Sequence, residues 1–351
     1  MALTLHGTVS DNTVALDRKT ATPLIINGDM AIAQRGTSET GITGSTYHTV
    51  DRFKTLISSL GTWTLSQSTD VPSGQGFSNS LKWDCTTANA SPSAGNYLAH
   101  QHKIEGQNLQ MLKKGTSSAE SFTFSFWVKS NKTGTYNVEM LDKDNSRMII
   151  KQYTIDSSNT WEKKVLSFAG DTTGTLDNDN AVSLEINMWL GAGSNYTSGT
   201  AQTSWGSQTN ANRAVGQVNL ADSTSNDWYI TGIQMEVGTF DSNSIPDFQF
   251  EDRATSLARC QRYYQIHNED AEAIFVYAAS YTSHQATFSY NIPFHCRMRT
   301  QPTVSTPSTS YINTGTITMQ ISDDIANMRG NSNNSGSGAR ITSSITMDAE
   351  L

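Results

Sequence analysis

The chain has 351 residues, a length typical of two or three domains with cores of their own. Only 16% of the residues are charged, and the net charge is −8. This acidic balance argues against nucleic acid as the main partner, because phosphate neutralisation needs clustered Lys and Arg. No apolar run approaches the length of a membrane span. The first residues do not show the basic segment followed by an apolar segment that is typical of a Sec signal peptide, so we do not expect Sec-type export.

Residues 1–22 are polar and rich in turn formers, so they cannot build a core alone. Fully extended, they would reach roughly 70 Å at about 3.3 Å per residue. Two interpretations stay open at this point. The segment is either an arm that docks on a larger assembly or a frayed terminus.

Residues 23–250 carry the pattern of an antiparallel β-sandwich. In the clearest strand, 121–130, Phe122, Phe124, Phe126 and Val128 recur with period two, so one face must be core. A turn at 131–135 leads into strand 136–140, which predicts a hairpin. Further strands are predicted at 63–67, 81–85, 97–104, 148–155, 161–168, 184–190 and 228–237. Short strands at this spacing are typical of a sandwich.

The segment 227–264 joins two structural signals. Its first half predicts a strand whose alternation shifts near Gly232, as expected of a β-bulge. Its second half predicts a linker helix over 251–264, with Leu257, Cys260, Gln261 and Tyr264 on one face. Residues 265–351 follow as a second, smaller β domain, with strands at 273–277, 286–292, 311–321 and 341–347 and a flexible loop at 331–338.

The same joint carries a family resemblance. Its order GIQMEVG (232–238), EDR (251–253) and CQRYY (260–264) resembles a module of phage tail-fibre and related virion appendage proteins. In that family a carbohydrate-binding-module-like jelly roll ends in such a strand and is followed by such a helix. IINGDMAIAQRG (25–36), with DRF at 51–53, resembles the family's opening segment, and residues 294–304 resemble its MR-x-x-PT strand entry.

The resemblance implies an all-β protein: a jelly-roll β-sandwich over 23–250, a short helix, and a second β domain. It implies a tail fibre or fibre-like appendage, made in the host cytoplasm, in which residues 1–22 dock on other virion proteins. It also implies a homo-oligomer, usually a trimer, whose repeated weak sites give firm attachment to a host-surface glycan. The alternatives are a head fibre or capsid decoration without a receptor role, a glycan depolymerase, and a bacterial surface lectin.

A long insertion at 191–220 holds the candidate glycan contacts. It is too polar for core and too long for an ordinary hairpin loop. Tyr196, Trp205 and Arg213 stand alone within it. Aromatic faces stack on the apolar faces of sugars while polar groups meet the hydroxyls. The alternative is that Trp205 anchors its loop against the sandwich or against a neighbouring subunit.

Metal ligands and structural cysteines are not predicted. His100 and His102 share a strand face but have no third ligand at a recognisable spacing. Asp142-x-Asp144-x-Ser146 lacks the glycine and the glutamate of an EF-hand, and residues 177–180 form an acidic turn. A structural calcium ion at either segment remains an open alternative. No cofactor is predicted. Cys85, Cys260 and Cys296 are widely separated, which favours buried thiols over disulfides or zinc.

Catalytic residues are not predicted either. Glycoside hydrolysis needs two carboxylates within a few ångströms of each other. Glu139, Glu185 and Glu236 lie on predicted strands, but their separation cannot be read from the sequence. No GxSxG, P-loop or dinucleotide fingerprint occurs. We therefore expect a binding protein rather than an enzyme.

Overall fold

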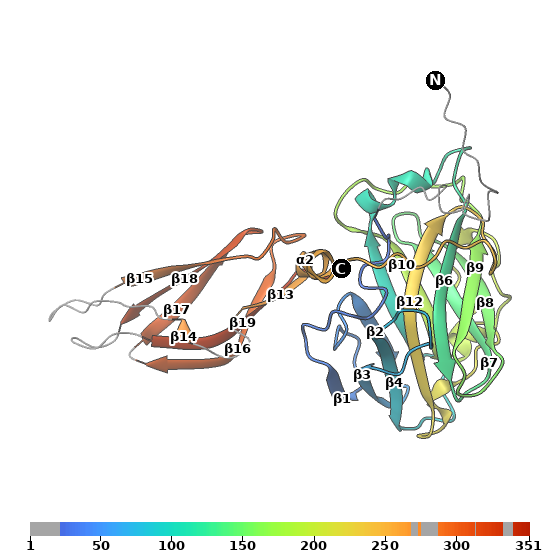
Figure 1. Ribbon diagram of the computed structural model, residues 1–351, viewed down its shortest axis with the longest axis horizontal. Coiled ribbons are helices and arrows are strands. Elements are labelled where there is room, and N and C mark those ends of the chain that lie inside the picture. The colour runs from blue at the N-terminus through green and yellow to red at the C-terminus, as the bar shows by residue number, and fades with distance from the viewer. Residues whose placement is uncertain (1–21, 268–272, 275–286, 313, 333–339) are drawn as a thin grey trace. The chain divides into compact units, whose positions relative to one another are not determined.

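A computed structural model describes residues 22–267, 273–274, 287–312, 314–332 and 340–351 (Figure 1). The predicted docking arm, residues 1–22, therefore lies outside the described residues except for its last position. The chain divides into two compact units, Met1–Glu251 and Asp252–Leu351. Among the helices described, none has the length and apolar character needed to cross a bilayer.

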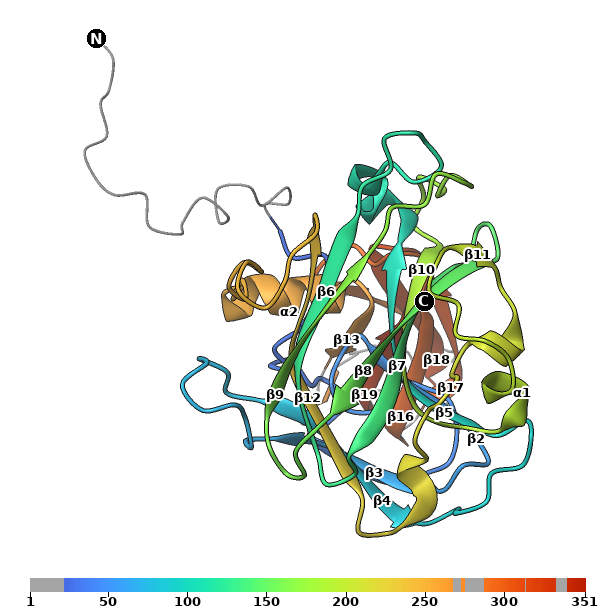
Figure 2. The ribbon, with the colours of Figure 1, turned by 90° about the vertical axis from the view of Figure 1, so that its right-hand side faces the viewer.

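The first unit is a jelly-roll-like sandwich of two six-stranded antiparallel sheets, which confirms the predicted all-β fold (Figure 2). The first sheet has the order β1 (Ser38–Ile42), β3 (Thr62–Ser68), β4 (Ser80–Thr87), β12 (Asp227–Val237), β6 (Phe122–Ser130) and β9 (Glu162–Phe168). The second has the order β11 (Gly206–Ser207), β8 (Arg147–Ile155), β7 (Gly134–Asp142), β10 (Val182–Ala192), β5 (Tyr97–Glu105) and β2 (Phe53–Ser58). Short helical turns occupy the connections: η2 (Gly106–Asn108), η3 (Gln110–Leu112), α1 (Ser194–Thr197), η4 (Asn210–Asn212) and η5 (Leu220–Asp222).

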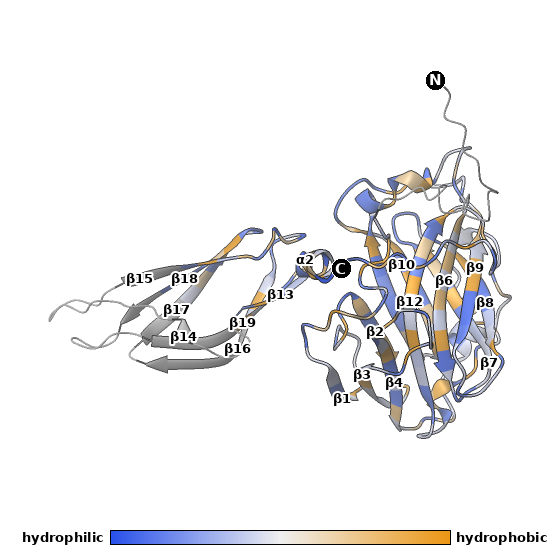
Figure 3. Cartoon of the chain, in the orientation of Figure 1, coloured by the Kyte–Doolittle hydropathy of each residue, from blue (hydrophilic) through white to orange (hydrophobic). Residues whose placement is uncertain are grey.

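The core lies between the two sheets. The four predicted apolar residues of β6 are all buried there, and Phe122 stacks on Phe168 of β9 at 5.2 Å between ring centroids. Burying each such side chain contributes about 1.5–3 kcal/mol to folding. Figure 3 shows the alternation of apolar and polar residues along these strands. Period-two patterning therefore builds this core, as predicted.

The outer face of the first sheet is also covered. Thr123 and Ser125, on the far face of β6, are almost fully buried. The Thr123 hydroxyl donates to the Gly238 carbonyl at 2.9 Å, and the Gln234 amide donates to the Pro246 carbonyl at 3.0 Å. The segment that follows β12 thus lies across the sheet and replaces solvent on that face.

The two segments that carry the family resemblance meet in space. The Ile233 N–H donates to the Gly28 carbonyl at 2.9 Å, and a Cβ on Gly28 would lie 2.1 Å from the Ile233 oxygen. The Asn27 side chain donates to the carbonyls of Ile32 and Asp51. These residues hold the opening segment against β12, so they serve the architecture of the sandwich.

The predicted irregularity of β12 is present. The register of β12 against β6 shifts between Thr231 and Gln234, and Gly232 has a φ of +62°. A Cβ at Gly232 would lie 2.6 Å from the Phe77 ring and 3.1 Å from the Trp127 ring. Glycine is therefore required there both by conformation and by space.

The second unit begins with α2 (Arg253–Gln261), capped by Asp252, whose side chain accepts from the Ala254 and Thr255 N–H groups. Tyr264 lies beyond this helix, because the chain turns there into β13. A four-stranded sheet is formed by β13 (Tyr264–His267), β14 (Ala273–Ile274), β16 (Thr303–Ile312) and β19 (Arg340–Asp348). A three-stranded sheet has the order β15 (Thr287–Pro293), β18 (Ile325–Ser332) and β17 (Thr314–Ile321).

The strand predictions for the second unit are partly wrong. The predicted strand 311–321 spans the end of β16 and all of β17, and β18 was not predicted. Asn331 and Ser332, which were expected in a loop, end β18. The rest of the predicted loop, residues 333–338, lies outside the described residues. The same holds for residues 275–277 and residue 286, which belong to two of the predicted strands.

Candidate functional site

The insertion at 191–220 lies over the outer face of the second sheet. The Asn137 side chain of β7 and the Gln152 side chain of β8 both donate to the Val215 carbonyl. The Val218 N–H donates to the Thr135 carbonyl, and Ala214 is fully buried. The insertion is thus a fixed layer above β7, β8 and β10.

Arg213 connects this layer to the sheet. Its Nε and Nη2 donate to the two carboxylate oxygens of Glu139 at 2.7 and 3.0 Å. Glu139 is fully buried on β7 and also accepts from Asn187 at 3.0 Å and from the Trp189 indole at 3.2 Å. Burial alone would lower the pKa of Arg213, but Glu139 raises it above its usual range. The Arg213 guanidinium therefore stays charged beside Glu139.

Two half-buried tyrosines border this ion pair. The Tyr196 ring lies 5.4 Å from the Trp189 ring and 5.7 Å from the Tyr97 ring, the latter at 85°. The Arg213 guanidinium carbon lies 5.1 Å from the Trp189 centroid and 6.0 Å from the Tyr196 centroid. Trp189 is buried, whereas Tyr97 and Tyr196 are partly exposed. We call Tyr97 and Tyr196 the tyrosine pair.

Of the three predicted contacts, the structure brings Tyr196 and Arg213 together and leaves Trp205 apart. The Trp205 indole donates to the Ala169 carbonyl at 2.7 Å, and its ring centroid lies 5.5 Å from the Lys114 ammonium. It also packs against the sandwich core. This position agrees with the alternative interpretation that Trp205 anchors its loop.

Tyr97 is absent from the predicted contacts. It is the first residue of β5 and pairs in register with Ala192 of β10, just before α1. An aromatic residue at a strand end beside a long insertion is the signal that could have identified it.

Asp142, from one of the two acidic segments considered for calcium, is paired with a lysine. The Lys114 ammonium lies 2.5 Å from Asp142 Oδ2 and 3.1 Å from Asp171 Oδ2. It also donates to the carbonyls of Thr173 and Gly174 at 2.9 and 2.8 Å. We call these five residues the Lys114 cluster. Within the described ranges, no three His, Cys, Asp or Glu side chains are placed to hold a metal ion.

His100 lies in the core rather than at a site. Its ring stacks on Phe53 at 4.9 Å, and burial lowers its pKa to about 3. Cys85 and Cys260 are buried thiols, as predicted, and Cys296 is half-buried.

The three glutamates considered for catalysis have different surroundings. Both oxygens of Glu139 are engaged by the contacts given above. Glu185 lies 3.6 Å from the Lys103 ammonium on the same sheet. Glu236 lies on the other sheet and is buried.

No protein-family model matches the sequence, and no curated protein matches it. Among solved structures, the chain is similar to the enzymatically active domain of tailspike protein 4 of bacteriophage CBA120, at 14% identity and a TM-score of 0.32. That match covers 61% of this chain and only 21% of the tailspike.

Two carbohydrate-binding modules from Clostridium thermocellum are also similar. One is a family 11 module in complex with a mixed-linked tetrasaccharide, at 13% identity and a TM-score of 0.29. That match covers 63% of this chain and 99% of the module. The other is the C-terminal family 22 module of Xyn10B, at 13% identity and a TM-score of 0.28. That match covers 60% of this chain and 98% of the module. At such TM-scores, these similarities indicate neither a ligand nor an activity.

Proposed function

We propose that this protein is a non-enzymatic virion appendage protein, a phage tail fibre or fibre-like protein, that attaches to a glycan on the host surface. The observation that carries the binding role is the tyrosine pair, mounted on a fixed layer by Trp189 and the Arg213–Glu139 ion pair. The virion setting is supported by the motifs at 25–36 and 232–264, and Gly28 of the first motif contacts Ile233 of the second.

The chemistry of the tyrosine pair suits a sugar. A half-exposed ring offers a flat apolar face to the C–H groups of a pyranose, and its hydroxyl exchanges hydrogen bonds with sugar hydroxyls. Because Tyr196 packs on Trp189 and lies close to Arg213, little side-chain freedom is lost on binding. The surface is small, however, so one copy binds weakly.

Assembly compensates for weak single sites. In a homotrimer the second and third contacts become intramolecular, which raises the overall affinity without any new contact. Residues 1–22 would attach the trimer to other tail or head proteins of the virion. Binding without a covalent step then suffices for adsorption.

Adsorption competition tests this function. Purified wild-type protein, added to host cells before the parent phage, is expected to block infection in a dose-dependent manner. Tyr196→Ala is expected to weaken blocking at least tenfold, because the ring that contacts sugar is removed. Trp161 is a half-buried aromatic residue that directly precedes β9 of the first sheet, and the Trp161→Ala control should block normally.

Two outcomes would contradict the proposal. A folded oligomer that fails to block at micromolar concentration would indicate a head fibre or decoration without a receptor role. Release of reducing ends from host polysaccharide, lost in Glu185→Gln, would indicate a depolymerase.

A further inference from the structure

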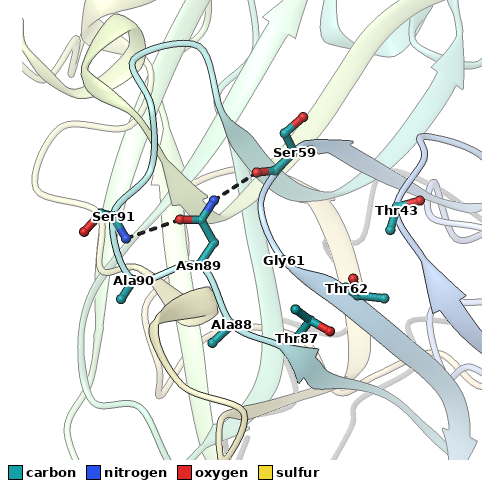
Figure 4. Close-up of a pocket in the computed structure, with 9 residues that line it drawn as sticks. All are labelled: Thr43, Ser59, Gly61, Thr62, Thr87, Ala88, Asn89, Ala90 and Ser91. Carbon is teal, nitrogen blue, oxygen red and sulfur yellow. Dashed lines mark hydrogen bonds between the residues drawn. The ribbon is translucent and has the colours of Figure 1, made fainter.

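An open groove of about 800 Å³ lies at one end of the sandwich (Figure 4). The Asn219 side chain, near the end of the insertion, donates to the carbonyl of the lining residue Asn89 at 2.8 Å. The groove is formed by the residue after β1, the turn between β2 and β3, and the end of β4 with the loop that follows. Its lining consists of Thr43, Ser59, Gly61, Thr62, Thr87, Ala88, Asn89, Ala90 and Ser91. We call it the hydroxyl groove.

The lining combines hydrogen-bonding capacity with the absence of charge. It presents five hydroxyl groups, those of Thr43, Ser59, Thr62, Thr87 and Ser91, and none of its nine residues is ionisable. Within the part of the chain that the structure describes, no hydrogen bond from these hydroxyls to the protein is found. Each hydroxyl both donates and accepts, which matches the hydroxyls of a sugar.

The groove is also held in shape. Ser59 and Gly61 have φ values of +50° and +79°, and a Cβ on Gly61 would lie 2.8 Å from the Thr87 carbonyl oxygen. The Asn89 amide donates to the Ser59 carbonyl at 3.1 Å, and its oxygen accepts from the Ser91 N–H at 3.3 Å. These are the two bonds drawn in Figure 4. A ligand therefore meets a surface that needs little ordering.

The loop between β4 and β5 connects the groove with the tyrosine pair. Its first residues, up to Ser91, line the groove, and six residues later Tyr97 begins β5. Six residues span at most roughly 20 Å when fully extended. The end of the same loop is fixed to the insertion, since the Asn195 N–H donates to the Ala94 carbonyl at 3.0 Å. An oligosaccharide of moderate length can therefore reach both places.

We propose that the hydroxyl groove is a second binding site for the glycan chain that the tyrosine pair contacts, and that it selects uncharged sugars. This inference rests on the proposed function. Selection follows from the lining, because no Lys or Arg in the groove could pair with a uronate or phosphate. The net charge of −8 also disfavours polyanions.

The test removes hydroxyls without changing shape. Thr62 and Thr87 are cross-strand partners in the β3–β4 pair, so Thr62→Val with Thr87→Val replaces two facing hydroxyls by methyl groups. Thr135 and Thr154 are cross-strand partners in the β7–β8 pair, outside the groove, and their double valine variant is the matched control. The probe is an array of purified bacterial surface polysaccharides, some neutral and some rich in uronic acid.

The wild type and the Thr135/Thr154 control are expected to retain the same neutral polysaccharides in equal amounts. The Thr62/Thr87 variant is expected to retain at least tenfold less of each. Equal retention by the Thr62/Thr87 variant, with loss in Tyr196→Ala, would overturn the second site and leave the proposed function standing. Stronger retention of uronic-acid polysaccharides by wild type would overturn the selection for uncharged sugars. Retention of no polysaccharide by wild type would overturn both proposals.

Discussion

At the scale of single residues, the face of the second sheet depends on buried charge. Glu139 is fully buried and would be costly without its partner, because a carboxylate removed from water needs a cation and hydrogen bonds. Arg213 supplies both in bidentate geometry, which a lysine could not reproduce. The ion pair therefore fixes the layer that carries Tyr196.

Arg213→Ala is expected to destabilise the protein by about 3–5 kcal/mol, since Glu139 would stay buried and unpaired. Denaturant unfolding, followed by tryptophan fluorescence, measures the change. Lys113→Ala, which breaks the more exposed pair with Glu120, is the control and should shift the midpoint little. A wild-type midpoint in Arg213→Ala would show that the insertion does not need this pair.

The Lys114 cluster makes stability depend on pH. Burial alone would raise the pKa of Asp171, but Arg147 and Lys114 lower it below the usual 3.8. A lowered folded-state pKa stabilises the fold above the unfolded value, and this contribution is lost as the pH falls through the folded value. Lys114→Met should raise the folded-state pKa of Asp171.

Lys114→Met is therefore expected to move the acid-unfolding midpoint to higher pH, and to lower stability at neutral pH by a few kcal/mol. Circular dichroism during acid titration follows the first effect, and denaturant unfolding at pH 7 the second. An acid midpoint identical to that of the wild type would contradict the role given to the ammonium.

At the scale of elements, the sequence patterns predicted the strands that bury one regular apolar face. The hairpin of β6 and β7 was predicted because Phe and Val recur there without interruption. In contrast, β2 was not predicted, since Thr55 stands on its core face between Phe53 and Ile57. β18 was not predicted because its buried face offers only Ala326 and Met328, too short an apolar run to stand out between Asn327, Arg329 and Asn331.

The candidate site was predictable only in part, for a related reason. Tyr196 and Arg213 were visible as isolated residues in a polar insertion. Their meeting with Glu139 and Trp189 depends on how the insertion folds over the sheet, and no periodicity encodes that path. The hydroxyl groove left no signal either, because Ser, Thr and Asn are common throughout the chain.

The contact between Gly28 and Ile233 of β12, which we call the seam, can be tested by adding a single methyl group. Gly28→Ala would place a Cβ 2.1 Å from a backbone oxygen, which cannot move without displacing β12. We expect a loss of about 1–3 kcal/mol, as for other overpacked sites. Gly44→Ala has nothing within 4 Å of the added carbon and is the matched control. Equal unfolding midpoints in the two variants would contradict the seam.

At the scale of the whole molecule, weak sites and many hydroxyls belong together. A chain with 16% charged residues presents many amides and hydroxyls, and under the proposed function these would bind neutral polymers through numerous small contacts. Such contacts become firm only when several act at once. Two sites on each sandwich and three sandwiches in the proposed trimer would together raise the overall affinity for a glycan chain in this way.

The Lys114 cluster has one more consequence for the molecule. Its cation is a covalent part of the chain, so dilution cannot remove it and a chelator cannot extract it. Asp142 at the end of β7, Asp171 and the Trp205 ring all contact Lys114, so these contacts need no divalent ion. We therefore expect the segment that carries Trp205 to keep its position in media that contain a chelator and no divalent cations.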